Sequence, residues 1–218
     1  MSNSIIVVKT DGTKTEVDRI DGLTIHFHGE NNSIEIYEPF RFWNNHIETR
    51  DNLRVTIGAH SSIDNVTIHK MWGSIRPYPV STVAIGSHFT CNGLHMFVSP
   101  DEGNIRIGND CMFSFGITMA ISDAHIILDK KKQKIINRNK DIVIGDHVWV
   151  GMNAALLKGV HIGNNSVIGA NAVVTKRYEQ ENIIIAGNPA RIVKKMIEWH
   201  RANYGEYIQM RNDYAGAV

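Results

Sequence analysis

The sequence predicts an all-β solenoid, in which short parallel strands wind around one core, and three observations support this fold class. An aliphatic residue recurs at every sixth position between residues 144 and 174. A glycine follows four of the first five of these residues, and a small or β-branched residue stands two positions before each. A period of six is typical neither of an α-helix nor of a single alternating strand. The aliphatic positions are Ile144, Val150, Leu156, Ile162, Ile168 and Val174.

Each six-residue unit fits one face of a triangular coil. The inward aliphatic side chains of successive units would then stack into a continuous column. Three faces make a coil of eighteen residues, and Ile144 and Ile162 are separated by 162 − 144 = 18. A glycine beside the column relieves crowding of the backbone at a corner. The spacing therefore predicts one parallel strand per face.

The same signal recurs upstream with interruptions. Ile-Gly pairs stand at 57–58, 85–86 and 107–108, and their separations of 85 − 57 = 28 and 107 − 85 = 22 exceed one eighteen-residue coil. The separation of 28 residues indicates a loop near 64–82. We also expect a long excursion at 122–141, between the Ile-Gly pair at 107–108 and Ile144, which takes the place of most of a coil. Long loops on a rigid solenoid commonly carry function.

The two ends of the chain differ from its middle. Residues 1–22 predict a capping hairpin that turns at Asp11-Gly12. Residues 23–186 form the solenoid domain. Residues 187–218 begin with a strand and continue into an incomplete apolar stripe at helical spacing, which includes Trp199. We expect this C-terminal α-helix to pack back on the coil.

Composition excludes several classes of protein. The 218 residues carry 23 basic and 22 acidic side chains, so the formal charge of +1 argues against a nucleic-acid-binding protein. Cys91 and Cys111 form no CxxC pair, which argues against a disulfide scaffold and a thiolate zinc site and favours a reducing compartment. The apolar run at 5–8 is too short for a signal peptide or a membrane span. We expect a cytoplasmic protein.

Three segments carry a resemblance to a known family. They are IVIGDHVWVG, GVHIGNNSVIGANAVVTK and IIAGNPARIVKK, and the match is tightest over 142–195 and looser back to about residue 85. The sequence resembles the hexapeptide-repeat acyltransferases, most of all the galactoside and maltose O-acetyltransferases and the bacterial capsular polysaccharide O-acetyltransferases, including those acting on polysialic acid. The resemblance implies a left-handed parallel β-helix, acetyl-CoA as donor, a sugar or polysaccharide hydroxyl as acceptor, and a homotrimer with active sites between subunits.

Three catalytic residues are implied by this resemblance. His125, in SDAH, matches the family's general base, and Asp123 either orients its imidazole or caps a turn. Asn92 matches an asparagine that contacts the acceptor, although asparagine also suits a left-handed corner. Trp149 points outward between inward positions, and it either lines the channel for the pantetheine arm or packs in the trimer.

The resemblance also implies a binding site for acetyl-CoA. Backbone groups of some matching residues would pair with the pantetheine amides, while cationic side chains suit the phosphates. The matching residues are Met152, Ala170, Thr175, Lys176, Arg191 and Lys194. The lysines at 130–132 and 134 either attract an anionic acceptor or form a solvated loop.

The reaction we expect is direct O-acetyl transfer with no metal and no acyl-enzyme. Cys91 and Cys111 stand at matching steps of their coils, which indicates core packing rather than a nucleophile. N-acetylation of an amino sugar, free or nucleotide-linked, is an alternative that uses the same base. A metal-dependent lyase needs three histidine ligands, and His26 and His28 are the only close pair that fits. A non-catalytic scaffold is the remaining alternative.

The sequence does not identify the acceptor. The loop near 64–82, which contains Trp72, Arg76 and Tyr78, either helps to select the acceptor or only extends the coil.

Overall fold

Three large β-sheets form the body of the protein in the computed structural model, which describes residues 2–73 and 78–215. The first sheet contains, in spatial order, β2 (Lys14–Glu16), β1 (Ser4–Val8), β4 (Ser33–Tyr37), β7 (Leu53–Ile57), β10 (Ser81–Ile85), β13 (Ile105–Ile107), β18 (Ile142–Ile144) and β21 (His161–Ile162). The second contains β25 (Ala190–Lys195), β24 (Ile183–Gly187), β22 (Val167–Ile168), β19 (Trp149–Val150), β14 (Met112–Phe113), β11 (Thr90–Cys91), β8 (Ser61–Asp64) and β5 (Phe40–Trp43). The third contains β23 (Val173–Val174), β20 (Ala155–Leu157), β15 (Ile117–Ala120), β12 (Leu94–Val98), β9 (Val66–Lys70), β6 (Asn45–Thr49) and β3 (Leu23–Phe27).

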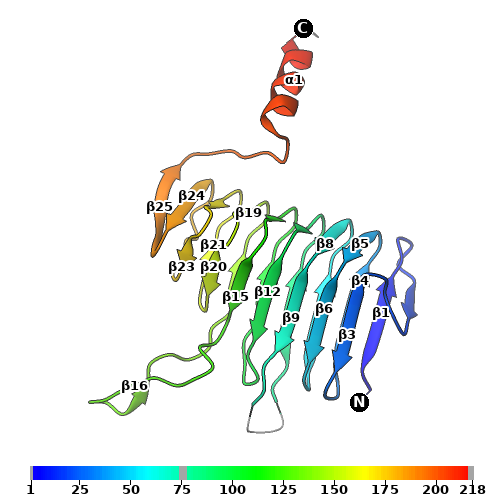
Figure 1. The fold of residues 1–218 in the computed structure, drawn as a ribbon, viewed down its shortest axis with the longest axis vertical. Coiled ribbons are helices and arrows are strands. Elements are labelled where there is room, and N and C mark those ends of the chain that lie inside the picture. The colour runs from blue at the N-terminus through cyan, green and yellow to red at the C-terminus, as the bar shows by residue number, and fades with distance from the viewer. Residues whose placement is uncertain (1, 74–77, 216–218) are drawn as a thin grey trace.

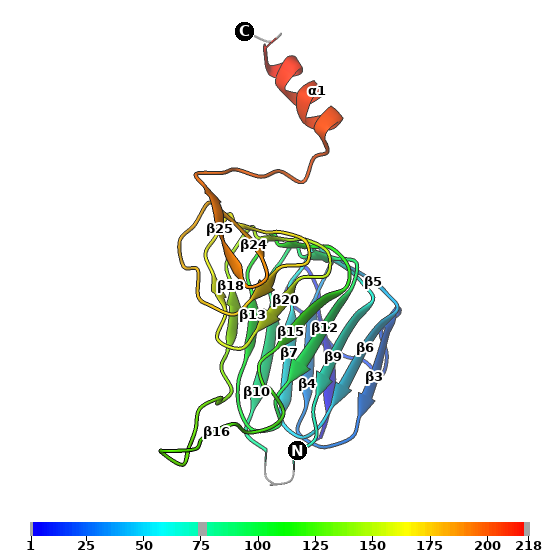
Figure 2. The ribbon, with the colours of Figure 1, turned by 60° about the vertical axis from the view of Figure 1, so that its left-hand side comes forward.

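The chain visits the three sheets in turn, so that each circuit is one three-sided coil (Figures 1 and 2). We call the corner between the first and second sheets the first edge, that between the second and third the second edge, and that between the third and first the third edge. Neighbouring coils pair in parallel, as at Ile107 opposite Ile144 and Val150 opposite Ile168. This mostly parallel arrangement of short strands is the one that the six-residue period predicts.

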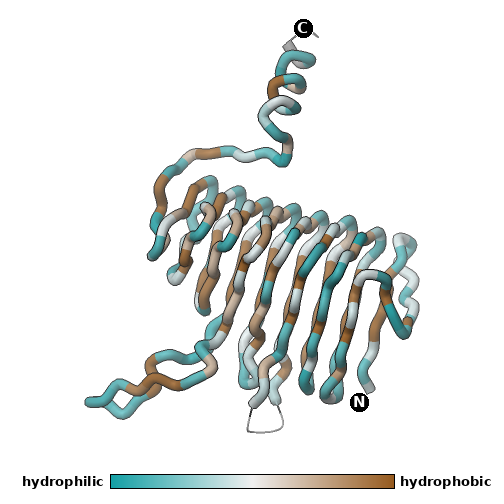
Figure 3. Tube along the Cα trace, in the orientation of Figure 1, coloured by the Kyte–Doolittle hydropathy of each residue, from teal (hydrophilic) through white to brown (hydrophobic). Residues whose placement is uncertain are grey.

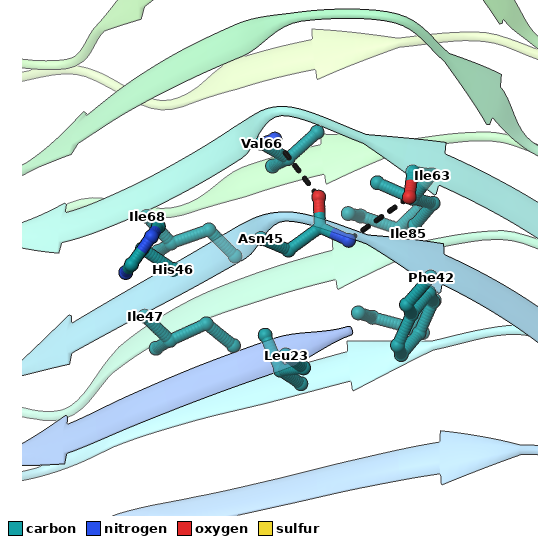
Figure 4. Close-up of a pocket in the computed structure, with 10 residues that line it drawn as sticks. Leu23, Phe42, Asn45, His46, Ile47, Ile63, Val66, Ile68 and Ile85 are labelled. Atoms are coloured by element: carbon teal, nitrogen blue, oxygen red, sulfur yellow. Dashed lines mark hydrogen bonds between the residues drawn. The ribbon is translucent and has the colours of Figure 1, made fainter. Parts of the chain in front are cut away.

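The core is the column of inward side chains that the repeat predicts. Val150, Leu156, Ile168 and Val174 are all fully buried. Figure 3 shows apolar positions recurring along every coil. The N-terminal half also buries the side-chain amide of Asn45, which donates a hydrogen bond to the Ile63 carbonyl and accepts one from the Val66 N–H, each at 2.9 Å (Figure 4). These bonds satisfy an amide that would otherwise be costly to bury among apolar residues.

The coils shorten from the N-terminus to the C-terminus. The register pairs Ile34 with Val55, a step of 55 − 34 = 21 residues, whereas Val143 pairs with His161, a step of 161 − 143 = 18. Strands of the N-terminal coils are up to five residues long, and those of the last coils are two or three. An eighteen-residue coil is therefore correct only for the C-terminal part.

The predicted loop near 64–82 is too wide. Residues 61–64 and 66–70 are strands β8 and β9, and β10 begins at Ser81, so the connection is confined to 71–80. Residues 74–77, and Arg76 with them, lie outside the described part of the chain. The loop is shorter than predicted because a coil in this part of the chain takes up 21 residues and not eighteen.

The long excursion at 122–141 stands where a full coil would otherwise lie. β13 and β18 are direct neighbours although 144 − 107 = 37 residues separate Ile107 from Ile144. The excursion leaves the third edge after β15 and ends in a small hairpin of β16 (Leu128–Asp129) and β17 (Lys134–Ile135), which extends away from the coil (Figure 1).

The N-terminal end has the predicted hairpin. β1 and β2 are antiparallel, and the turn between them holds Gly12 at a φ of +85°. That backbone conformation favours glycine over residues with a side chain. β1 also pairs in parallel with β4, so the hairpin closes this end of the first sheet.

The C-terminal end differs from expectation. The helix α1 (Tyr204–Ala215) projects away from the coil instead of packing back on it (Figures 1 and 2). Asn203 caps it, because the Asn203 side chain accepts from the Glu206 N–H while the Glu206 carboxylate accepts from the Asn203 N–H. This capping box starts the helix beyond Trp199, so the stripe that we assigned to a helix lies largely in the extended segment 196–203, here called the strap. No helix among the described residues is long and apolar enough to cross a membrane.

Candidate active site

His125 lies at the start of the excursion, beside the third edge. Its backbone N–H donates to the Asp123 carbonyl at 2.7 Å, and the Asn137 side chain donates to the His125 carbonyl at 2.8 Å. These bonds fix the backbone and leave the side chain exposed. The His125 imidazole is therefore accessible from solvent on a fixed backbone.

Asp123 anchors the excursion to the coil. Its carboxylate accepts hydrogen bonds from Lys158 and, at 2.8 Å, from Asn137. The bonds from Lys158 and then Asn137 hold the pKa of Asp123 below its usual value. Because both carboxylate contacts are to these residues, Asp123 positions the loop around His125 rather than the imidazole itself.

Asn92 lies at the second edge, just before β12. Its backbone N–H donates to the carbonyls of Phe113 and Ser114, at 3.3 Å each, and its side chain is exposed. The backbone of Asn92 is not in the left-handed region, in contrast to Asn65 and Asn153 at neighbouring corners. A requirement for a left-handed corner therefore does not explain this asparagine.

His125 and Asn92 stand at opposite edges of the third sheet. Asn92 precedes β12, and the excursion with His125 follows the end of its neighbour β15. A five-residue strand spans about 15 Å at roughly 3.3 Å per residue. One chain alone therefore does not bring these two predicted residues together.

Trp149 points outward, as predicted, and is 39% exposed. Its neighbour is a residue that sequence reasoning did not connect to it: the ring centroids of Trp149 and Trp199 lie 6.1 Å apart. Trp199 in turn stacks on His147 at 4.0 Å and donates from Nε1 to the His147 carbonyl at 2.9 Å. The strap thus lies beside one side of Trp149.

Arg201 fastens the same strap to the first edge. Its guanidinium donates to the Asp110 carboxylate at 2.8 Å, to the Thr90 hydroxyl at 2.7 Å and to the His88 carbonyl at 3.0 Å. Burial raises the pKa of Asp110, but hydrogen bonds from His147 and Arg201 outweigh it and hold this pKa below its usual value. Nothing in the repeat marks Arg201, so only the structure reveals this role.

Three of the residues predicted to bind acetyl-CoA, Met152, Ala170 and Arg191, lie near the second edge, and Lys194 lies further along β25 toward the first edge. Met152 and Ala170 are on successive coils, where the Asn171 N–H donates to the Met152 carbonyl at 2.8 Å. Arg191 and Lys194 are on β25, opposite Ala186 and Ile184 of β24. Lys194 is exposed, and the guanidinium of Arg191 contacts the Ala190 carbonyl at 2.7 Å.

The other two predicted residues, Thr175 and Lys176, lie at the third edge. They line a surface groove whose remaining cationic residues are Lys140, Lys158 and Arg177. The predicted acetyl-CoA residues therefore form two groups on opposite sides of the third sheet. The part of the chain that the structure describes contains no cluster of three or more His, Cys, Asp or Glu residues that could hold a metal ion.

Both cysteines are core residues, as predicted. Cys91 and Cys111 are buried, and burial raises the pKa of each thiol to about 12. The thiolate is the nucleophilic form of cysteine, so neither residue has the chemistry of a nucleophile at neutral pH.

We expect the folded protein to resist alkylation at both cysteines. Iodoacetamide at pH 8 should label neither thiol within the time in which it labels both in urea, because burial blocks access and keeps the thiols protonated. Mass spectrometry of the intact protein measures the number of labels. Rapid native labelling of either cysteine would contradict core packing.

Comparison with known proteins shows which sequence repeat the chain carries. Residues 141–176 match the model of the bacterial transferase hexapeptide repeat. The chain therefore carries the repeat of the hexapeptide transferases, and the resemblance predicted from the sequence is confirmed.

The chain is similar to two curated proteins and to one solved structure. The chain is 37% identical over 146 residues to the polysialic acid O-acetyltransferase of Escherichia coli O1:K1 / APEC, covering 66% of this chain and 47% of the relative. It is 33% identical over 104 residues to the polysialic acid O-acetyltransferase of Neisseria meningitidis, covering 48% of each. The matched region thus spans about half the length of these curated relatives. The crystal structure of the polysialic acid O-acetyltransferase OatWY superposes with a TM-score of 0.76 at 27% identity, covering 98% of both chains.

Proposed function

We propose that this protein transfers an acetyl group from acetyl-CoA to a hydroxyl of a sugar or polysaccharide. The observation that carries the proposal is the similarity to OatWY over 98% of both chains. The position of His125 adds support, since an exposed imidazole at the base of the excursion is accessible to an acceptor. Polysialic acid, which the names of the relatives give as their acceptor, is the first acceptor to test.

In the proposed reaction His125 acts as general base. A neutral imidazole near pH 7 accepts the proton of the acceptor hydroxyl while the hydroxyl oxygen attacks the thioester carbonyl carbon. A backbone N–H stabilises the charge that develops on the carbonyl oxygen. The carbon–sulfur bond breaks, and the imidazolium returns its proton to the departing thiolate sulfur. The buried cysteines take no part.

The assembly we propose is a homotrimer of left-handed coils with active sites shared between copies. Two separations within one chain support a shared site: His125 is far from Asn92, and Met152 and Ala170 are across the third sheet from Thr175 and Lys176. A neighbouring copy would bring the second edge of one chain to the third edge of another. Trp149 would then shield the thioester, and the Lys176, Arg191 and Lys194 cations would face the phosphates of acetyl-CoA.

The direct test is release of free thiol from acetyl-CoA by the purified protein. The acceptor panel contains free sugars, sialic acid oligomers and amino sugars, and each is compared with a reaction without acceptor. We expect release that depends on a hydroxyl acceptor and an O-acetylated product by mass spectrometry. Release with amino sugars alone, giving an N-acetylated product, would contradict O-acetyl transfer. Failure to bind acetyl-CoA in calorimetry would contradict the whole proposal.

A further inference from the structure

Three polar or aromatic side chains form a row on the outer face of the second sheet, near the second edge. The register pairs Trp43 of β5 with Asp64 of β8. It also pairs Cys91 of β11 with Ile63, which places the next residue, Asn92, beside Asp64. Adjacent strands lie about 4.8 Å apart, so the row spans roughly 10 Å from Trp43 to Asn92.

Trp43 has no role in the core of its coil. Phe40 and Phe42 of the same strand point inward and stack on each other with centroids 4.8 Å apart. Trp43 points the opposite way, as alternation along a strand requires, and is 68% exposed. A large indole face held on a rigid strand and open to solvent is a surface to which a ligand ring can stack.

Asp64 supplies an unused hydrogen-bond acceptor beside that indole. Its Oδ1 atom is buried and makes no hydrogen bond in the structure. A buried carboxylate oxygen without a donor is unfavourable, and because Asp64 as a whole is only half-buried, rotation of its carboxylate would bring this oxygen to a ligand hydroxyl that donates to it. Trp43, Asp64 and Asn92 line one surface pocket together with Arg41, Ser62, Ile63 and Cys91.

We propose that this row is a subsite for further sugar rings of an oligomeric acceptor. One ring stacks on Trp43 and donates a hydroxyl to Asp64, while Asn92, which can donate and accept, contacts the ring that is acetylated. The inference rests on the proposed function, because that function makes the acceptor a saccharide. The strands of the coil fix the distance between Trp43 and Asn92, so the subsite favours a chain of sugars over a single sugar.

Calorimetry without acetyl-CoA tests the subsite separately from catalysis. The probes are a sialic acid hexamer and maltohexaose, one acidic and one neutral, with the corresponding monosaccharides. We expect at least one hexamer to bind, and Trp43→Ala to weaken that binding by about 10-fold or more. Trp43→Phe, which retains an aromatic face, should stay within about 3-fold of the original chain. Tyr204→Ala, which removes an exposed aromatic from α1, is the matched control and should bind as the original chain does.

Kinetics add a second measurement where transfer occurs. Trp43→Ala should raise KM for the hexamer about 10-fold and leave kcat and the KM for acetyl-CoA unchanged, because the indole binds a ring that does not react. Binding that is weakened in Trp43→Ala, in a protein that transfers no acetyl group, would support the subsite and overturn the proposed function.

Three results would overturn the subsite itself. The first is that neither hexamer binds the original chain. The second is that the original chain and Trp43→Ala bind the hexamer with equal affinity while acetyl transfer remains intact. The third is dissociation of the oligomer by Trp43→Ala in sedimentation velocity, which would show that the indole lies between copies of the chain.

Discussion

Replacement of His125 by alanine is expected to lower kcat/KM for acetyl transfer by about 100- to 10,000-fold. The reason is that the acceptor hydroxyl then has no base to take its proton during attack on the thioester. The contacts that hold this loop would remain, because the bonds to Asp123 and Asn137 use the backbone of residue 125. Thiol release with saturating acetyl-CoA measures the effect. The affinity for acetyl-CoA should change little.

The matched control is His46→Ala, which removes another exposed histidine, on β6 of the N-terminal coils. It should retain the activity of the original chain. A His125→Ala activity within about 3-fold of that control would show that His125 is not the base. Mixing His125→Ala with Asn92→Ala, after unfolding and refolding together, should restore part of the activity if one site uses His125 and Asn92 from different copies.

Replacement of Lys70 by methionine is expected to reduce the free energy of unfolding by about 1–3 kcal/mol. Lys70 ends β9 and is completely buried, and its ammonium donates to the carbonyls of Asp51, Asn52 and Pro79 at 2.8, 3.2 and 3.2 Å. Methionine fills a similar volume but cannot donate, so it leaves buried acceptors without these hydrogen bonds. Urea unfolding measures the loss.

Lys9→Met is the control for this prediction, because Lys9 is exposed and its substitution should change stability by less than about 0.5 kcal/mol. A loss for Lys70→Met no greater than that of the control would show that the three hydrogen bonds contribute nothing.

The contribution of Lys70 should also depend on pH. Burial lowers the pKa of Lys70 from 10.5 to about 8. Between these two values the unfolded chain binds more protons at this residue than the folded chain, so folding becomes more favourable as the pH rises. The stability difference between the original chain and Lys70→Met should therefore grow from pH 8 to pH 10. A difference that is constant over this range would contradict a depressed pKa.

The C-terminal coils could be predicted closely from the sequence because their strands are short and each unit has six residues. Ile144 and Ile162 are neighbours in the first sheet, as their spacing predicts. The N-terminal coils could not be predicted as well, since strands such as β7 and β9 have five residues and lengthen each coil. A fixed period fails there, although the inward alternation at Leu53, Val55 and Ile57 persists.

The positions of single candidate residues in the fold could be predicted from the sequence, but their arrangement relative to one another could not. The position of His125 at the excursion and the outward direction of Trp149 follow from the repeat. The separation of His125 from Asn92 depends on which edge of the coil each residue occupies, and local patterns do not determine that. Trp199 and Arg201 were missed as site neighbours because the strap has no period of its own, and its contacts lie 52 to 113 residues away along the chain.

The contacts of the strap affect how the coils of the protein unfold. In a solenoid each coil touches mainly its neighbours, so an end coil can open without disturbing the middle. Here Arg201, which follows the last strand, is bonded to His88 and Thr90 in the middle of the stack and to Asp110 one coil further on. These hydrogen bonds link the C-terminal segment to coils whose residues precede it by more than 90 positions in the sequence. Opening of the C-terminal coils must break this tie, which joins the last and middle coils into one cooperative unfolding unit.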